Sequence, residues 1–289
     1  MVRVTQCGVT LLFMGSGRSA MTNMHNIYQV DAFTNKLFGG NPAAVIPLED
    51  WPDDATLLAI AQENNLSETA FLKPDGAGFE LRWFTPAAEV ALCGHATLAS
   101  AHVVFNHLNF NGDSVAFRTR QSGTLVVTQR KDSLLAMQFP SIEVAPCDCP
   151  DNLVNALGVA PTACLQGFYS QDESDYIAVL DTEDQVRRCD PDLSELRQLS
   201  SRGLIVTAAG NDCDFVSRYF APAFGIDEDP VTGSAHCLLA PYWGQRLSKV
   251  ELRARQVSRR GGEIMCTLGS DHVILAGAAV DYLLGQIRY

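Results

Sequence analysis

Residues 79–99 read FELRWFTPAAEVALCGHATLA, and residues 215–240 read FVSRYFAPAFGIDEDPVTGSAHCLLA. Each stretch begins as an alternating strand, passes through Phe-x-Pro, and continues through a glycine and a polar residue into an apolar run. Arg82 and Arg218 are 136 residues apart, and Gly94 and Gly233 are 139 apart. This period is too long for a solenoid, whose units run to tens of residues. The pattern therefore predicts two similar domains.

Length and composition agree with two domains. A chain of 289 residues that is 47% hydrophobic can fill two cores. It carries 33 acidic and 21 basic side chains, a net charge of -12, which disfavours binding to nucleic acid or to an anionic membrane surface. No stretch reaches the 18 or so apolar residues of a membrane span. We therefore expect a small-molecule partner, with no nucleic acid and no membrane.

The nine cysteines are scattered, odd in number and without CxxC spacing. This usage is typical of a reducing compartment, so we expect a cytoplasmic protein. Cys147 and Cys149 form a close pair with no His or further Cys nearby in the sequence. His102, His107 and His272 also lack sequence neighbours that would indicate ligation. The sequence therefore predicts no metal site.

The repeat divides the chain into a leader and two domains. Residues 1–24 contain Arg3 and a short apolar stretch that imitates a weak signal peptide, but we interpret them as a flexible leader before the first strand. An N-terminal domain is expected over 25–140 and a C-terminal domain over 150–289, whose last strand can cross back to the first domain. The residues between them, rich in proline and cysteine, are the expected linker.

Each half contains one helix that is apolar nearly all round, over 95–105 in the first half and 235–243 in the second. Such a helix is buried on every side, so the strands must wrap it. The fold class is therefore expected to be α+β, with two pseudo-symmetric domains that are each a curled mixed sheet around a central helix.

Both expected helices begin at a glycine that precedes a polar residue: Gly94 before His95, and Gly233 before Ser234. Glycine allows a ligand to approach the backbone closely, and first-turn amides are unpaired donors at the positive end of the helix dipole. Two such ends facing one cleft would bind an anion such as a carboxylate. The alternative is that both glycines serve only tight turns.

The halves differ at Glu68, which begins an apolar strand in Asn65-Leu66-Ser67-Glu68-Thr69. An offset of 136 makes Leu204 its counterpart, so only the first half has the carboxylate. A carboxylate between apolar neighbours has a raised pKa and can exchange protons near neutral pH. The alternative is a solvated residue at the end of a strand.

Five motifs, taken together, resemble the PhzF family of phenazine-biosynthesis-like isomerases. They are Asp31-Ala32-Phe33-Thr34, Gly40-Asn41-Pro42-Ala43, Leu66-Ser67-Glu68-Thr69-Ala70-Phe71, Phe84-Thr85-Pro86 with Gly94-His95-Ala96-Thr97, and Glu228-Asp229-Pro230-Val231-Thr232-Gly233-Ser234-Ala235. The resemblance extends from residue 27 to the C-terminus. It implies the diaminopimelate-epimerase-like fold, with the active site between the two domains, and it does not imply a role in phenazine synthesis.

The resemblance also implies a proton shift that needs no cofactor, with Glu68 as the acid/base. The motif positions place His95 and Asp229 with it as catalytic residues; the implied substrate-binding residues are Gly94, Gly233, Ser234, Ser67 and Asn41. His95 could instead only cap its helix, and Asp229 could instead only satisfy first-turn amides.

Related epimerases and racemases of this fold use two cysteines, one from each domain. Cys93 stands where one of them would be, but Thr232 occupies the matching position of the second half. We therefore expect Cys93 to be a buried filler and His236 and Cys237 to belong to the core.

The sequence thus predicts a cofactor-independent, cytoplasmic isomerase that moves a proton on a small carboxylate-bearing metabolite. A thiol-dependent racemase or epimerase and a non-catalytic binding or regulatory homologue are the alternatives. The resemblance further implies a homodimer. The substrate itself is not specified by the sequence.

Overall fold

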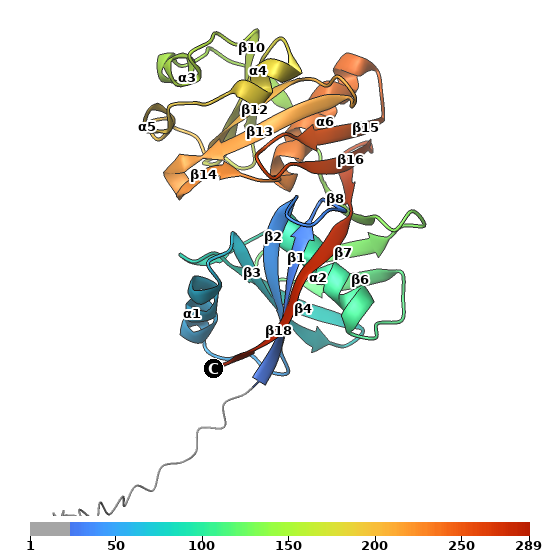
Figure 1. Cartoon of the computed structure of the whole chain (residues 1–289). Helices are drawn as coiled ribbons and strands as arrows, with labels where there is room; N and C mark the ends of the chain where they lie inside the picture. The colour runs from blue at the N-terminus through green and yellow to red at the C-terminus, as the bar shows by residue number, and fades with distance from the viewer. Residues whose placement is uncertain (1–23) are drawn as a thin grey trace, which may run out of the picture.

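The computed structural model describes residues 24–289. Figure 1 shows them as two lobes, one above the other, joined by strands that pass between them. The leader expected over 1–24 lies outside the described residues except for Met24, which is the first residue of a strand. Among the helices of residues 24–289, none is long and apolar enough to cross a membrane.

The first lobe has one helix inside a curled sheet and a second helix, α1, on the outside of the sheet (Figure 1). Its elements are β1 (Met24–Ala32), β2 (Asn41–Pro47), α1 (Asp54–Asn64), β3 (Glu68–Asp75), β4 (Gly78–Phe84), β5 (Glu89–Val90), α2 (Gly94–His107), β6 (Ser114–Arg118), β7 (Thr124–Gln129), β8 (Leu135–Pro140) and the last strand of the chain, β18 (Ala279–Arg288).

The second lobe has the same plan with more helices on its outer face. Its elements are β9 (Val144–Pro146), α3 (Asp151–Leu157), β10 (Ala163–Phe168), β11 (Ser174–Val179), α4 (Glu183–Arg188), α5 (Leu193–Leu196), β12 (Gly203–Ala209), β13 (Phe215–Ala221), the 3-10 helix η1 (Pro222–Phe224), β14 (Ile226–Asp229), α6 (Gly233–Leu247), β15 (Glu251–Gln256), β16 (Gly262–Leu268) and β17 (His272–Gly277).

The strand pairings of one lobe repeat in the other. β2 and β3 are parallel and β3 and β4 antiparallel, as are β11, β12 and β13 in the second lobe. After that, β4 pairs in parallel with β6, and β13 does so with β15. The α+β fold of two pseudo-symmetric domains around central helices is therefore confirmed.

Each half of the chain also gives one strand to the opposite lobe. β9, which follows β8, pairs with β10 of the second lobe. β18, which follows β17, pairs with β1 of the first lobe from Met24 opposite Arg288 to Ala32 opposite Ala279. Between these exchanged strands, β8 and β17 pair with each other. Main-chain hydrogen bonds therefore join the two lobes.

The central helices lie inside one continuous apolar core. The helix expected over 95–105 spans Gly94–His107, and the one expected over 235–243 spans Gly233–Leu247. Buried side chains of both helices belong to the same hydrophobic cluster, which runs through the junction of the lobes. Smaller clusters lie under α1 and under the helices α3 to α5. The two helices are thus held rigidly with their first turns at the junction.

Candidate active site

The two central helices begin beside the same ladder of strands. A Cβ atom at Gly94 would meet only the Phe139 ring, at 3.6 Å, and one at Gly233 would meet only Leu275, at 3.9 Å. Phe139 in β8 and Leu275 in β17 lie on paired strands, two positions apart along their ladder. The two helix starts therefore lie close together on either side of the junction.

Neither helix start is closed by its own N-cap residue. Cys93 precedes α2 and Thr232 precedes α6, and neither side chain makes a capping hydrogen bond. Packing does not require either glycine, because a methyl group would make only ordinary contacts there. First-turn amides that lack a cap are donors for an anion. This geometry favours the ligand-binding interpretation of Gly94 and Gly233.

Glu68 reaches the start of α2 because α1 ends just before it. Asp53 caps α1 by accepting a hydrogen bond from the Thr56 amide, and Asn65 ends the helix in a left-handed conformation with φ 48°. The chain then enters β3 at Glu68. Its Oε2 atom lies 3.0 Å from His95 Nε2, and the two side chains are 14% and 8% exposed. Oε2 makes no aligned hydrogen bond with any described residue, so it can accept a proton or a donor from a ligand.

Cys93 lies on the other side of the imidazole, with its Sγ atom 3.5 Å from His95 Nδ1. Burial lowers the pKa of His95, but the Cys93 sulfur and the Glu68 carboxylate outweigh it, and the pKa lies well above the ordinary value. Burial raises the pKa of Cys93 itself, so this residue is a neutral thiol at neutral pH. We therefore regard Glu68 as the charge that keeps His95 protonated.

Asp229 lies at the end of β14, and its carboxylate is held from both lobes. Oδ1 accepts a hydrogen bond of 2.8 Å from Asn41 Nδ2, and Oδ2 accepts one of 2.5 Å from Thr232 Oγ1. Burial raises its pKa to about 6, although the charge of His95 and the hydrogen bond from Thr232 act in the opposite direction. The carboxylate accepts from side chains rather than from the first-turn amides of α6, so the alternative of a simple helix cap is not what the structure shows.

Asn41, expected to bind substrate, contacts Asp229 and the loop that follows it. It is fully buried, and its Nδ2 also donates to the Val231 carbonyl at 3.0 Å. Its Oδ1 has no hydrogen-bond partner among the described residues. Gln256 supports the same loop, because it donates to the Asp229 carbonyl and accepts from the Thr232 amide. Ser67 makes no side-chain hydrogen bond to another described residue and is half-buried beside Glu68.

Ser234 contacts Arg202, a residue of the site that was not expected from the sequence. Its Oγ accepts a hydrogen bond of 2.8 Å from Arg202 Nη2. The Arg202 guanidinium lies 4.3 Å from the centre of the Tyr169 ring, and its Nε is 3.7 Å from Asp175 Oδ1. A cation is therefore fixed beside the first turn of α6, where it can bind a carboxylate.

The register of the strands explains why Arg202 was missed. Thr69 pairs with Phe84 and Leu204 pairs with Phe220, so Leu204 corresponds to Thr69. The counterpart of Glu68 is therefore Gly203, and the expected equivalence of Glu68 and Leu204 is wrong by one residue. Arg202 then occupies the place of Ser67. The conclusion that only the first half carries the carboxylate is unchanged.

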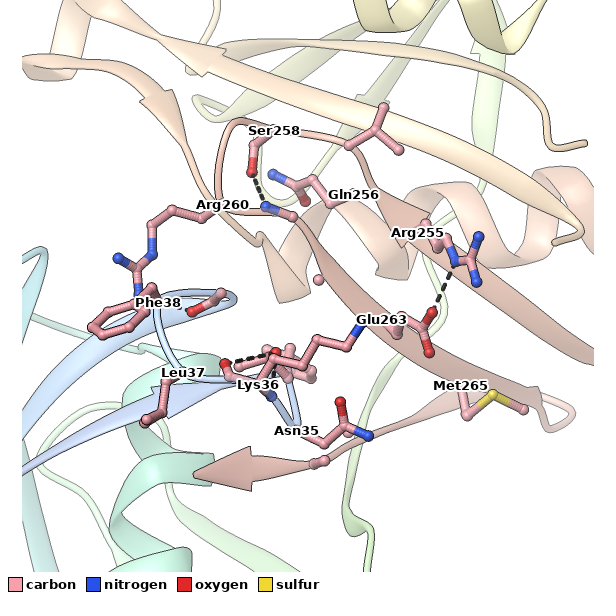
Figure 2. Close-up of a pocket in the computed structure, with 18 of the residues that line it drawn as sticks. Asn35, Lys36, Leu37, Phe38, Arg255, Gln256, Ser258, Arg260, Glu263 and Met265 are labelled. Atoms are coloured by element: carbon pink, nitrogen blue, oxygen red, sulfur yellow. Dashed lines mark hydrogen bonds and ion pairs between the residues drawn. The ribbon is translucent and has the colours of Figure 1, made fainter. Parts of the chain in front are cut away.

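A pocket of about 630 Å³ lies at a different place on the lobe junction and does not include Glu68, His95 or Ser234. Figure 2 shows the loop after β1 facing the hairpin of β15 and β16 across it. Arg260 of the hairpin spans the two lobes, donating to Asp31 Oδ1 at 2.8 Å and to the Gly40 carbonyl at 2.9 Å. This pocket is thus bridged by Arg260 and is separate from Glu68, His95 and Ser234.

Glu68, Cys93 and His95 offer ligand atoms that all lie within 4.8 Å of one another. These three side chains could hold a metal ion, but the thiol would first have to lose its proton. Without a metal, the same arrangement is suited to proton transfer, with a carboxylate and an imidazolium from one lobe facing a carboxyl group of the other.

Two pseudo-symmetric lobes with paired helix starts at their junction define the class of diaminopimelate-epimerase-like proteins.

Comparison with known proteins identifies the family. The family described as phenazine biosynthesis-like protein, PhzC-PhzF, matches residues 30–285. An uncharacterized isomerase of Pseudomonas aeruginosa is 49% identical over 261 residues, which cover 90% of this chain and 97% of that protein. The crystal structure of a PhzF-family phenazine biosynthesis protein from Enterococcus faecalis has a TM-score of 0.86 and 42% identity, covering 92% of this chain and 99% of that chain.

A more distant likeness concerns the fold alone. A hydroxyproline epimerase from Agrobacterium vitis is 10% identical, with a TM-score of 0.56 and 92% of each chain covered. The chain belongs to the PhzF family, and the resemblance inferred from its motifs is confirmed. It is an isomerase of that family.

Proposed function

We propose that the protein shifts a proton within a small carboxylate-bearing metabolite, without a cofactor, in the space between its lobes. The observation that carries this proposal is the Glu68–His95 ion pair of 3.0 Å at the start of α2, with Asp229 near enough for the charge of His95 to affect its pKa. The groups come from both halves of the chain. A substrate between the lobes would therefore meet all of them at once.

The first-turn amides of α2 and α6 and the Arg202 guanidinium bind the substrate carboxylate in this proposal. The attraction of the substrate anion to the Arg202 guanidinium and to nearby amide donors outweighs its repulsion by the net charge of -12. The reason is that repulsion from distant charges is screened over about 8 Å at physiological salt. Binding of the carboxylate fixes the position of the substrate. The C–H group next to the carboxylate then lies within reach of Glu68, which is the first residue of β3.

Glu68 removes a proton from one carbon of the substrate and returns it at another position of the same molecule, so that no atom is gained or lost. His95, held protonated, donates a hydrogen bond to the developing negative charge. Asp229, with a pKa of about 6, can accept or release a proton near neutral pH and can help its return. The assignments of Glu68, His95 and Asp229 as catalytic residues belong to this proposal.

A thiol-dependent racemase is the main alternative, because Cys93 contacts His95. Such an enzyme needs a second thiol in the other lobe, and Thr232 stands at the position that matches Cys93. The nearest cysteine in α6, Cys237, donates to the Gly233 carbonyl, and burial raises its pKa to about 12. The geometry therefore favours Glu68 over a thiol pair.

Exchange of Glu68 for Gln tests the proposal directly. The variant keeps the shape of the side chain but cannot take up a proton at neutral pH, so it should bind the substrate and fail to incorporate deuterium from solvent. Candidate substrates come from a thermal-shift screen of small amino and hydroxy acids. The matched control is Cys93→Ser, which should retain exchange. If Cys93→Ser loses deuterium exchange while Glu68→Gln retains it fully, the racemase mechanism replaces the proposal. If the wild type binds a ligand but does not exchange deuterium into it, the protein is a binding protein.

The proposal includes a cytoplasmic homodimer. All eight cysteines of residues 24–289 are free thiols, which supports a reducing compartment. In the described chain β18 pairs only with β1, so its other edge is open, and its Tyr282, Leu283 and Leu284 are 48%, 41% and 59% exposed. An open strand edge with apolar side chains is a surface that proteins usually cover. A second copy of the chain is the occupant that we propose.

A further inference from the structure

Three side chains of metal-binding type meet at the far end of α2. His102 and His107 lie in its last turns, and Asp281 lies in β18. His102 Nε2 is 3.2 Å from Asp281 Oδ1, and His107 Nε2 is 3.0 Å from Asp281 Oδ2. At a rise of 1.5 Å per residue along the helix, His102 is roughly 10 Å and His107 roughly 18 Å from His95. The cluster is therefore separate from the candidate active site.

The spacing of these atoms suits a tetrahedral metal ion. Zinc binds imidazole nitrogen and carboxylate oxygen at about 2.0–2.2 Å, which places neighbouring ligand atoms roughly 3.3 Å apart. His102 Nε2 and His107 Nε2 lie 3.2 and 3.0 Å from different oxygen atoms of the Asp281 carboxylate, and one ligand atom from each of the three side chains lies within 4.8 Å of the others. Two imidazoles and one carboxylate leave a fourth position for water.

Two of these atoms lack a partner in the described chain. His102 Nε2 and Asp281 Oδ1 are buried, and although they are 3.2 Å apart their geometry does not make a hydrogen bond. Buried polar atoms without partners cost stability. A cation between them would satisfy both at once. The side chains are still 15%, 20% and 29% exposed, so an ion can enter from solvent.

We infer that His102, His107 and Asp281 form a binding site for a divalent transition-metal ion, with Zn²⁺ as the best match to two imidazoles and one carboxylate. The ion would connect β18, which comes from the second half of the chain, to the central helix of the first lobe. On the far side of His102, Asn106 Nδ2 lies 3.3 Å from Nδ1. The same Nδ2 donates a hydrogen bond of 2.8 Å to the His102 carbonyl.

The test is zinc binding by untagged, chelator-treated protein, measured by calorimetric titration and by the shift of the unfolding temperature. His102→Asn removes an imidazole ligand and Asp281→Asn removes the carboxylate charge; each should weaken binding by about tenfold or more, since loss of an outer-shell partner alone typically costs about 10–100-fold. The matched controls are His272→Asn, at a surface pair in which His272 contacts Asp271 at 2.9 Å, and Cys93→Ser, in the other group of possible ligands. Both controls should bind zinc as the wild type does.

Each outcome decides for or against the site. Wild-type binding at one ion per chain, lost in both ligand variants and accompanied by a rise of a few degrees in unfolding temperature, supports it. Unchanged affinity in His102→Asn and Asp281→Asn, loss in Cys93→Ser, or no binding by the wild type would overturn it. Cobalt offers a second measurement, because ligation by Cys93 would give a thiolate charge-transfer band that this site lacks. Should Asp281→Asn fold poorly by circular dichroism, His107→Gln replaces it.

Discussion

Replacing Asp229 by Asn should make the folded protein more stable at alkaline pH while it abolishes turnover. Burial raises the pKa of Asp229 from 3.8 to about 6. One pKa unit corresponds to about 1.4 kcal/mol, so ionised Asp229 costs the folded state about 3 kcal/mol. Asn keeps an acceptor for the Asn41 amide but loses the anionic acceptor for Thr232. We therefore expect a net gain of about 2 kcal/mol at pH 8.

The sign of the pH dependence follows from the direction of the shift. The pKa of Asp229 is higher in the folded protein than in the unfolded chain, so protonation of Asp229 favours the folded state. This contribution to the free energy of unfolding is fully present below pH 3.8 and is lost as the pH rises through about 6. The advantage of Asp229→Asn should therefore be about 2 kcal/mol smaller at pH 4.5 than at pH 8.

The assay is urea unfolding followed by tryptophan fluorescence at the two pH values. Amine buffers with chloride are needed, because carboxylate, phosphate or sulfate ions would bind at the helix starts. Asp227→Asn is the matched control on the same strand; Asp227 is 68% exposed, so its exchange should change stability by less than about 0.5 kcal/mol. A variant at Asp229 that is less stable than wild type at pH 8, or a gain that does not depend on pH, would refute the reasoning.

Three further predictions concern the anion site, the turn before β2 and the open strand edge. Arg202→Met should weaken the binding of sulfate or substrate carboxylate by about tenfold, whereas Arg246→Met should not, as measured by unfolding temperature against anion concentration. In a urea titration, Gly40→Ala should lower the free energy of unfolding by more than about 3 kcal/mol, because Gly40 has φ +61° and the new Cβ would lie 2.1 Å from the Ala32 carbonyl oxygen. The control Gly76→Ala should lower it by only about 1 kcal/mol, because Gly76 has φ +60° but no atom lies within 4 Å of its new Cβ. Light scattering at micromolar concentration should give a dimer mass for the wild type and a monomer mass for Leu284→Lys, and a monomeric wild type would contradict the dimer.

Much of the fold could be read from local patterns. The repeat of Arg82 and Gly94 at Arg218 and Gly233 predicted two equivalent lobes, because each lobe is built from the same order of strands around one buried helix. The apolar runs predicted both helices, since a helix without a polar face must be enclosed. Each of these features depends on residues close together in the chain.

The grouping of Glu68, His95 and Asp229 was expected only through the family resemblance. Spacing along the chain does not specify that Asn41 of one lobe holds Asp229 of the other. The equivalence of Glu68 with Leu204 failed by one residue, because a constant offset ignores changes in loop length, whereas the strand pairings show the true register. Arg202 was missed for the same reason.

The sequence by itself determined the two-lobed fold, the family and the chemistry-bearing residues of each half. Only the tertiary structure decided which of them meet. His102 and His107 are close to each other in the sequence, but their partner Asp281 comes from β18, 174 residues after His107, because the last strand returns to the first lobe. Such contacts depend on strand exchange and register. Local propensity and hydrophobic periodicity do not encode them, because they result from how separate segments share one core.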